Sequence, residues 1–208
     1  TTDGTITESR TLEAGGNIGL TTNTGAITTN AAAKAGTDLT LNTTNGDITT
    51  NGTLDAGEDI ALLTTKGNIS GNGAQTAGQD LIWQARSGDL TVNGKLKAGR
   101  YLTLTTDKGK ITTTAQGELA SDEAMNVTTG EGDINLNADA TSGGLLNIEA
   151  SRQGNITSAA GTLLSSTGSN ANIYTNQGNV NLYDVYALKD AAAGTKDGSV
   201  TIHKIDGE

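Results

Sequence analysis

The feature that most constrains the fold is a sequence repeat in which the same short motifs recur at every twenty-first position. The dipeptide Ala-Gly recurs at this spacing through the first half of the chain, beginning at Ala14, Ala35, Ala56, Ala77 and Ala98. A second mark, a glycine followed two positions later by an aliphatic residue, keeps the same spacing from Gly4 to Gly109. It continues with slightly unequal steps to Gly132, Gly154, Gly178 and Gly198. Ten copies at a nearly fixed period indicate a solenoid.

Within one period, the residue pattern predicts short strands separated by turns. Apolar residues alternate after each Ala-Gly pair, at Ile18 and Leu20, Leu39 and Leu41, Ile60 and Leu62, Leu81 and Trp83, and Leu102 and Leu104. Alternation with a period of two is typical of a strand. We expect the following Thr-Thr-x-Gly segment to be a turn and the next aliphatic residue to mark a second strand. A third strand is marked by Leu12, Ala33, Leu54 and Leu96.

Three short strands and three turns in one period describe one coil of a parallel β-helix. Parallel crossovers are right-handed in almost all proteins. We therefore predict an all-β fold, a right-handed parallel β-helix (a solenoid) of about ten coils, with roughly 21 residues in each coil. Stacked coils give a continuous core, which explains how a chain with only 34% hydrophobic residues and no Phe can fold. Trp83 falls on an inward position and is expected in this core.

The spacing also predicts how the β-helix is divided along the chain. Residues 1–208 form a single β-helix segment, with regular coils in 1–119 and longer coils in 120–183. An irregular C-terminal coil and tail occupy 184–208, where the stretch 186–194 is expected to be a loop or a short helical turn. Because the chain begins within the repeat at Thr1, we interpret it as a segment of a longer protein.

Composition excludes several functional classes. The net charge is −10, and the 13 basic residues are scattered, which argues against nucleic-acid binding. The absence of Cys removes disulfides and thiolate metal sites from consideration. No apolar run reaches the roughly 18 residues needed to cross a membrane as a helix, so we expect a protein that is not embedded in a membrane.

Stacking places equivalent residues of successive coils in vertical files. One file contains four asparagines at the spacing of the repeat, Asn30, Asn51, Asn72 and Asn93. Side-chain amides one coil apart can hydrogen-bond along the stack, so a structural asparagine ladder is expected. Another file is formed by Thr7 and its equivalents, which suggests an ice-binding face. The parallel file of Thr5, Ala26, Asp47, Asn68, Asp89 and Lys110 is too mixed and charged for such an array.

A file of three carboxylates, Asp38, Asp59 and Asp80, has two interpretations. Each Asp can hydrogen-bond the backbone of its turn, which is a structural role. Alternatively, the file can bind Ca²⁺, which prefers oxygen ligands, or form an acidic catalytic groove. The regular recurrence of the residue favours the structural role. We therefore expect no catalytic residues, no enzymatic activity and no bound cofactor, with Ca²⁺ at this file as the alternative.

Tyrosines and the single histidine lie toward the C-terminus. We predict Tyr174, Tyr183 and Tyr186 as ligand-contact candidates, because exposed aromatic rings stack on sugars and supply interface contacts. The alternative is that these rings fill a wider coil. His203 lies in the tail on an alternating pattern and is expected at the surface.

The phased motifs resemble a known family. AGTDLTL (35–41), AGEDIAL (56–62), AGQDLIW (77–83) and AGRYLTL (98–104) are each followed, after four residues that include Thr or Ser, by glycine, one residue and an aliphatic residue. They resemble the haemagglutinin repeats of filamentous haemagglutinin-like exoproteins, which are bacterial surface adhesins exported by two-partner secretion. The resemblance covers roughly residues 1–180 and implies a right-handed parallel β-helix that serves as a fibrous stalk.

The resemblance further implies a secreted protein at the bacterial cell surface, with a role in cell adhesion or biofilm attachment. The implied partners are an outer-membrane transporter during export and a glycan or receptor on a host or bacterial surface. The alternative function is a carbohydrate-binding or polysaccharide-cleaving β-helix that uses the acidic file or the C-terminal tyrosines.

Overall fold

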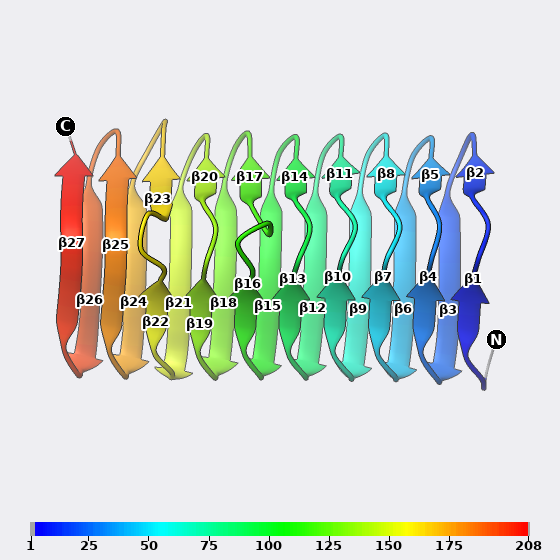
Figure 1. Cartoon of the computed structure of the whole chain (residues 1–208), viewed down its shortest axis with the longest axis horizontal. Coiled ribbons are helices and arrows are strands. Elements are labelled where there is room, and N and C mark those ends of the chain that lie inside the picture. The colour runs from blue at the N-terminus through cyan, green and yellow to red at the C-terminus, as the bar shows by residue number, and fades with distance from the viewer. Residues whose placement is uncertain (1–2, 208) are drawn as a thin grey trace.

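Parallel strands stack along one axis in about ten coils, as the computed structural model of residues 3–207 shows (Figure 1). In the view of Figure 1 the nearer strands run upward, the chain crosses behind and returns downward, and successive coils advance from right to left. This sense of rotation makes the β-helix right-handed. The predicted all-β right-handed parallel β-helix is therefore confirmed. None of residues 3–207 lies in a helix, so this range contains no helix long and apolar enough to cross a membrane.

Each regular coil contains two short strands and one longer strand. The first short strands are β1 (Ile6–Glu8), β4 (Ile27–Thr29), β7 (Ile48–Thr50), β10 (Ile69–Gly71), β13 (Leu90–Val92), β16 (Ile111–Thr113), β19 (Ile134–Leu136) and β22 (Ile156–Ser158). The second short strands are β2 (Leu12–Ala14), β5 (Ala33–Ala35), β8 (Leu54–Ala56), β11 (Gln75–Ala77), β14 (Leu96–Ala98), β17 (Leu119–Ser121), β20 (Ala140–Ser142) and β23 (Leu163–Ser166). The long strands are β3 (Ile18–Thr24), β6 (Leu39–Asn45), β9 (Ile60–Lys66), β12 (Leu81–Ser87), β15 (Leu102–Lys108), β18 (Met125–Glu131), β21 (Leu146–Gln153), β24 (Ala171–Gln177) and β26 (Ala191–Asp197).

Two sheets form the walls of the β-helix. The long strands make a nine-stranded sheet that runs from β3 to β26, and the short strands make the opposite sheet. Near the C-terminus each pair of short strands is replaced by a single longer strand, first β25 (Val180–Ala187) and then β27 (Val200–Gly207). Residues at equivalent positions of successive coils pair directly, for example Leu39 with Ile60 and Ile60 with Leu81.

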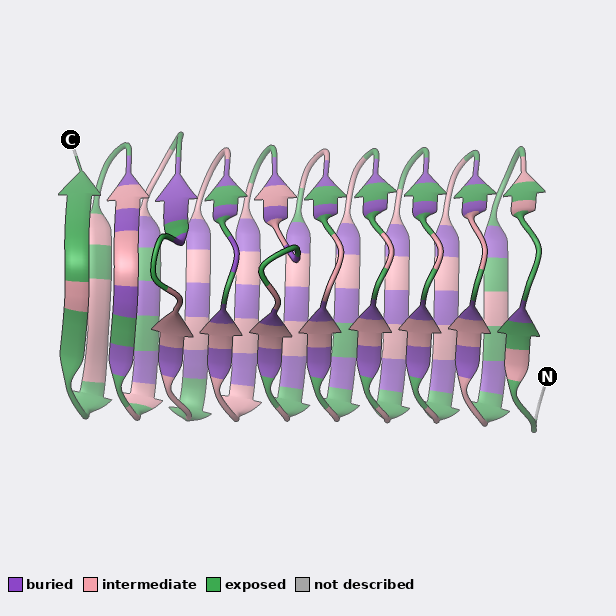
Figure 2. Cartoon of the chain, viewed as in Figure 1, coloured by how far each residue is buried: buried purple, intermediate pink, exposed green. Residues whose placement is uncertain are grey.

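The core lies between the two sheets and runs along the whole axis. In the regular coils every second strand residue points inward, which gives the alternating buried bands of Figure 2. Five aliphatic residues at successive levels of one file are fully buried: Ile27, Ile48, Ile69, Leu90 and Ile111. Trp83 is fully buried as well, which confirms its expected place in the core. Within residues 3–207, β27 pairs with β25 alone, and Val200 and Ile205 are exposed.

Turn glycines are required by the closeness of the coils. Gly25 has a φ of 114°, a conformation that L side chains rarely adopt. A Cβ added there would also lie 2.6 Å from the carbonyl carbon of Gly4, one coil below. Gly88 faces the carbonyl of Gly67 in the same way. The glycine that marks each period therefore allows two backbones to approach at a sharp corner.

Two expectations about local structure were wrong. The Thr-Thr-x-Gly segment is not wholly a turn, because the long strand continues through both threonines and ends just before the glycine, as in β6. The stretch 186–194 was expected to be a loop or a short helical turn, but within it only 188–190 lie outside strands. Residues 184–207 belong to the end of β25, a short turn, β26 and β27, so 186–194 contains neither a long loop nor a helical turn.

Candidate functional site

The asparagine file forms a ladder of hydrogen bonds on the surface. The Asn51 Nδ2 group donates to Asn30 Oδ1 at 2.8 Å. Asn72 donates to Asn51 in the same way at 2.7 Å, and Asn93 donates to Asn72 at 2.7 Å. Each interior member thus donates to the coil below and accepts from the coil above, so this file ties four coils together.

The three carboxylates of the acidic file act on the backbone of the next coil. Asp38 Oδ1 accepts the backbone N–H of Asp59 at 3.4 Å, and Asp59 Oδ1 accepts that of Asp80 at 3.0 Å. Asn17 holds the equivalent place in the first coil and accepts the N–H of Asp38 at 3.2 Å. This geometry is that of the structural interpretation, in which each side chain satisfies one backbone donor at a corner.

Asp80 ends this file and is neutralised by an arginine. The Arg100 guanidinium donates from Nε to Asp80 Oδ1 at 2.8 Å and from Nη2 to Oδ2 at 2.7 Å. This hydrogen-bonded guanidinium lowers the pKa of Asp80 below its usual range, although partial burial opposes the shift. The same contact raises the pKa of Arg100. Within residues 3–207, no three acidic or histidine side chains are grouped so that they could hold a metal ion, and Asp38, Asp59 and Asp80 do not converge on one point.

A second file of Asp and Asn residues performs the same capping role at another corner. Asp47 Oδ1 accepts the N–H of Asn68 at 2.7 Å, and Asn68 Oδ1 accepts that of Asp89 at 2.8 Å. Further along the chain, Asp133 and Asn155 continue the pattern at 2.9 Å each. The sequence pattern suggested only an ice-binding surface for this file, and its capping role was not predicted. The available signal was that Asp or Asn usually follows the turn glycine.

Buried threonines form a third ladder that sequence reasoning also missed. Each threonine hydroxyl donates to the carbonyl of the turn glycine one coil below, as Thr43 does to Gly25 at 3.0 Å and Thr106 to Gly88 at 2.9 Å. The same bond is made by Thr22, Thr64, Thr129, Thr175 and Thr195. The hydroxyl is needed because a buried carbonyl without a donor is costly.

The predicted tyrosine patch is divided between the two walls of the β-helix. Tyr174 lies on β24 of the nine-stranded sheet, points outward and is 41% exposed. Tyr183 and Tyr186 lie on β25 of the opposite sheet and are partly buried. Tyr183 stacks against His203 with ring centroids 4.3 Å apart, and His203 Nδ1 lies 2.9 Å from Asp184 Oδ1. The three tyrosines therefore do not form one ligand-contact surface, and His203 lies at the surface as expected.

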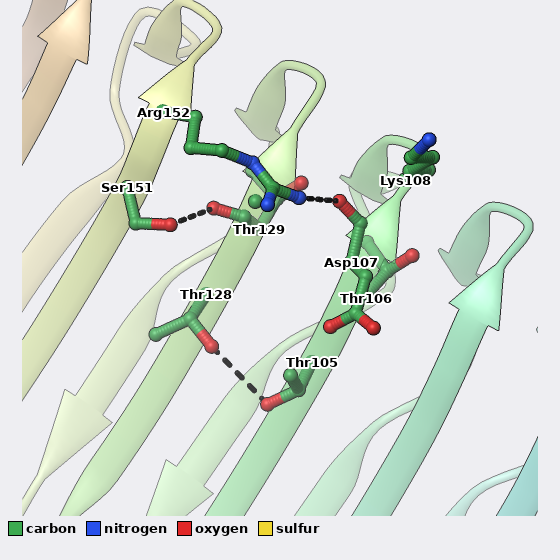
Figure 3. Close-up of a pocket in the computed structure, with 9 residues that line it drawn as sticks. Thr105, Thr106, Asp107, Lys108, Thr128, Thr129, Ser151 and Arg152 are labelled. Atoms are coloured by element: carbon green, nitrogen blue, oxygen red, sulfur yellow. Dashed lines mark hydrogen bonds between the residues drawn. The ribbon is translucent and has the colours of Figure 1, made fainter.

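A shallow hollow of about 440 Å³ opens on the outward face of the nine-stranded sheet, over β15, β18 and β21 (Figure 3). It lies beside a β-bulge, where Ser151 and Arg152 together face the single residue Gly130. Arg152 crosses the space above Gly130 and donates to the Asp107 carbonyl at 3.2 Å, while its Nε lies 3.3 Å from Glu131 Oε1. A side chain at position 130 would collide with Arg152, so Gly130 keeps the hollow open.

Hydroxyl groups form the remaining wall of this hollow. Thr105 Oγ1 and Thr128 Oγ1 lie 3.1 Å apart across β15 and β18, and Ser151 donates to the Thr129 carbonyl at 3.3 Å (Figure 3). The hollow thus offers hydroxyls and one guanidinium in an open setting, and Lys108 lies at its rim with its side chain directed away (Figure 3). Such a surface suits hydrogen bonding to a polar ligand.

The fold and these files define the protein as a β-solenoid, a parallel β-helix built from a short repeat. Comparison of the chain with protein-family models, with curated proteins and with solved structures gave no match. The family resemblance described above stays a prediction that rests on the repeated motifs.

Proposed function

We propose that this chain is a stiff stalk segment of a secreted bacterial surface filament that mediates cell adhesion or biofilm attachment. The observation that carries the proposal is the continuous register of the coils. Parallel pairing runs without interruption from β3 to β26 in one sheet and from β1 and β2 to β27 in the other. A structure of this kind has its repeat along one axis and grows in length without changing its cross-section.

The ladders add support because they resist separation of neighbouring coils. Asparagine amides, Asp and Asn caps and buried threonines each connect a coil to the next at a different corner. With a spacing of about 4.8 Å between strands, ten coils extend roughly 45 Å. Bending such a rod has to stretch backbone hydrogen bonds on one wall and compress the other, so the segment is stiff.

Location and partners come from the resemblance to filamentous haemagglutinin-like exoproteins. In this proposal the chain leaves the cell through an outer-membrane transporter and projects from the cell surface, where the filament meets a glycan or receptor. Its role is mechanical, and no catalytic step is assigned to it. The chain contains no Cys, which suits export because no cross-link can form during unfolded passage.

Antibodies raised against the folded chain test this proposal on intact cells of the source organism. The expected result is labelling on the outside of unpermeabilised cells, along filaments, together with reduced attachment when Fab fragments are added. Preimmune Fab fragments serve as the control. Labelling that requires permeabilised cells would contradict the proposed location, and unchanged attachment would contradict the adhesive role.

A further inference from the structure

The outward face of the nine-stranded sheet carries almost no charge in the first two outward positions of its strands, whereas the third outward position carries Arg86, Asp107, Arg152 and Lys196. Two files of outward residues cross all nine strands, one from Gly19 to Ala192 and the other from Thr21 to Gly194. Among these positions Glu149 is the single charged residue. The charged residues of the chain lie mainly at corners, on the second short strands and near the ends of the long strands, so these two files form a nearly uncharged band on the face.

One part of the face gathers amides, a hydroxyl, a carboxylate and an aromatic ring. We call it the Tyr174 patch, and its members are Asn126, Thr128, Asn147, Glu149, Asn172 and Tyr174. Register brings them together, because Asn147 pairs with Asn126 and Asn172, while Glu149 pairs with Thr128 and Tyr174. Neighbours across strands are about 4.8 Å apart and neighbours along a strand about 7 Å apart, so the patch spans three coils and is compact.

Most polar groups of the patch have no partner inside the protein. Within residues 3–207, the side chains of Asn126, Asn147, Glu149 and Asn172 and the Tyr174 hydroxyl make no hydrogen bond or ion pair with another residue. This contrasts with the Asn and Asp files at the corners, whose members are engaged in capping. The patch therefore presents free donors and acceptors to the solvent.

The Tyr174 ring is held where a ligand can reach it. It is 41% exposed, and its neighbour in the next coil is Gly194. A Cβ on Gly194 would lie 3.6 Å from Cδ2 of Tyr174, so the missing side chain leaves the ring uncovered on that side. Such a ring offers an apolar surface for C–H groups and a hydroxyl at its end.

We infer that the Tyr174 patch binds an uncharged, extended oligosaccharide chain. A pyranose ring has one apolar face that stacks on an aromatic ring, and hydroxyls that bond to amides and to a carboxylate. Glu149 is suited to accept two neighbouring sugar hydroxyls, and its charge, with the net charge of −10, disfavours acidic sugars. Thr128 belongs both to the patch and to the hollow of Figure 3, which gives the chain room for further sugar rings.

This site goes beyond the stalk role, because a stalk needs no ligand of its own. Loss of the inferred binding would leave the proposed surface location and mechanical role unaffected, since those are tested on whole cells. Conversely, sugar binding by the purified chain is independent of where the filament is found.

Affinity electrophoresis of the 208-residue chain tests the site, with dextran, mannan or xylan as uncharged polysaccharides and alginate or heparin as acidic ones. Retardation is expected in at least one uncharged polysaccharide. Tyr174→Ala is expected to weaken this binding about tenfold, and Tyr174→Phe by much less, because the ring surface is retained. Glu149→Gln is expected to weaken binding about threefold.

The matched control is Tyr101→Ala, because Tyr101 is 40% exposed but lies in the turn just before β15, outside the patch. Its binding is expected to equal that of the unmodified chain, and thermal unfolding checks that every variant is folded. The inference is overturned if no uncharged polysaccharide retards the chain or if acidic polysaccharides alone do so. Equal losses in Tyr101→Ala and Tyr174→Ala would also overturn it.

Discussion

At the scale of single residues, the interior is adapted around one large side chain. Trp83 Nε1 donates to Gln75 Oε1 at 2.9 Å, and Gln75 Nε2 lies 2.9 Å from Thr50 Oγ1. Ala85 takes the place of the buried threonine in this coil, and Gly71 leaves room for the indole ring. The buried amide and the indole N–H thus satisfy each other in a core that is otherwise built from small and aliphatic residues.

Replacing Gly71 by Ala is expected to destabilise the protein by about 1–3 kcal/mol, because the added methyl group would overlap the Trp83 ring. Urea denaturation followed by tryptophan fluorescence measures the change. Gly19→Ala is the control, since a Cβ at that outward position meets nothing within 4 Å. Equal stability of the two variants would contradict the packing described for Trp83.

Removing one buried hydroxyl tests the threonine ladder. Thr43→Val keeps the shape of the side chain but leaves the Gly25 carbonyl without its donor, so the free energy of unfolding is expected to fall by about 1 kcal/mol. Thr44→Val, at an exposed position of the same strand, is expected to change it by less than about 0.5 kcal/mol. Chemical denaturation of both variants gives the comparison, and a smaller loss in Thr43→Val than in Thr44→Val would argue against the ladder.

The Asp80–Arg100 pair predicts a dependence of stability on pH. The folded pKa of Asp80 lies below its ordinary value of 3.8, so the pair stabilises the fold above about pH 4 and loses its effect as the pH falls through the folded pKa. Arg100→Gln is expected to lower the free energy of unfolding slightly at about pH 6, because exposed ion pairs contribute little, and to leave it unchanged at the acidic end of the titration. Urea denaturation across this pH range measures the difference.

Arg86→Gln is the control, because Arg86 has no partner within residues 3–207. A pH-independent loss would contradict this assignment.

At the scale of elements, most of the coil could be predicted from the sequence, but the full length of its strands could not. The regular period and the alternation of Leu and Ile were sufficient to predict the stacked coils and the inward positions. Strand length was misjudged because threonine is polar and resembles a turn residue, whereas its buried hydroxyl is satisfied by a neighbouring coil. Such a partner is distant in the sequence, as Gly25 is from Thr43, and has no local signal.

The candidate site was harder to predict for a related reason. The walls on which Tyr174, Tyr183 and Tyr186 lie depend on where β24 ends and β25 begins, and the Ala-Gly mark is absent from this region. The amide-rich neighbours of Tyr174 come from strands in neighbouring coils, and the unequal coil lengths near the bulge hide their alignment. The asparagine ladder, by contrast, lies in coils of constant length, where equal spacing alone aligns the residues.

The asparagine ladder gives a prediction that belongs to this scale. Asn72→Ala removes two side-chain hydrogen bonds, those with Asn51 and Asn93, whereas Asn93→Ala at the end of the ladder removes one. The interior variant is expected to lose about 1 kcal/mol and the end variant about half as much, as measured by thermal unfolding. Equal losses would mean that the rungs do not act as a connected ladder.

At the scale of the whole molecule, strand pairing joins each coil to its immediate neighbours, so stiffness and length arise from repetition. The outward residues of the second short strands form a straight file in which Glu13 and Thr141 are separated by six coil steps, through Lys34, Asp55, Thr76, Lys97 and Ala120. At about 4.8 Å per step, their backbones are expected about 29 Å apart. A flexible segment of the same length would separate them by roughly 60 Å on average, with a broad spread.

The most direct test of the stacked rod is a distance measurement between spin labels at these two positions by pulsed electron paramagnetic resonance. The chain has no native Cys, so Glu13→Cys with Thr141→Cys gives a doubly labelled protein without further changes. A single narrow distribution centred at about 29 Å, broadened only by the label side chains, is the expected result. A broad distribution, or one centred at roughly 60 Å, would contradict the rigid in-register solenoid.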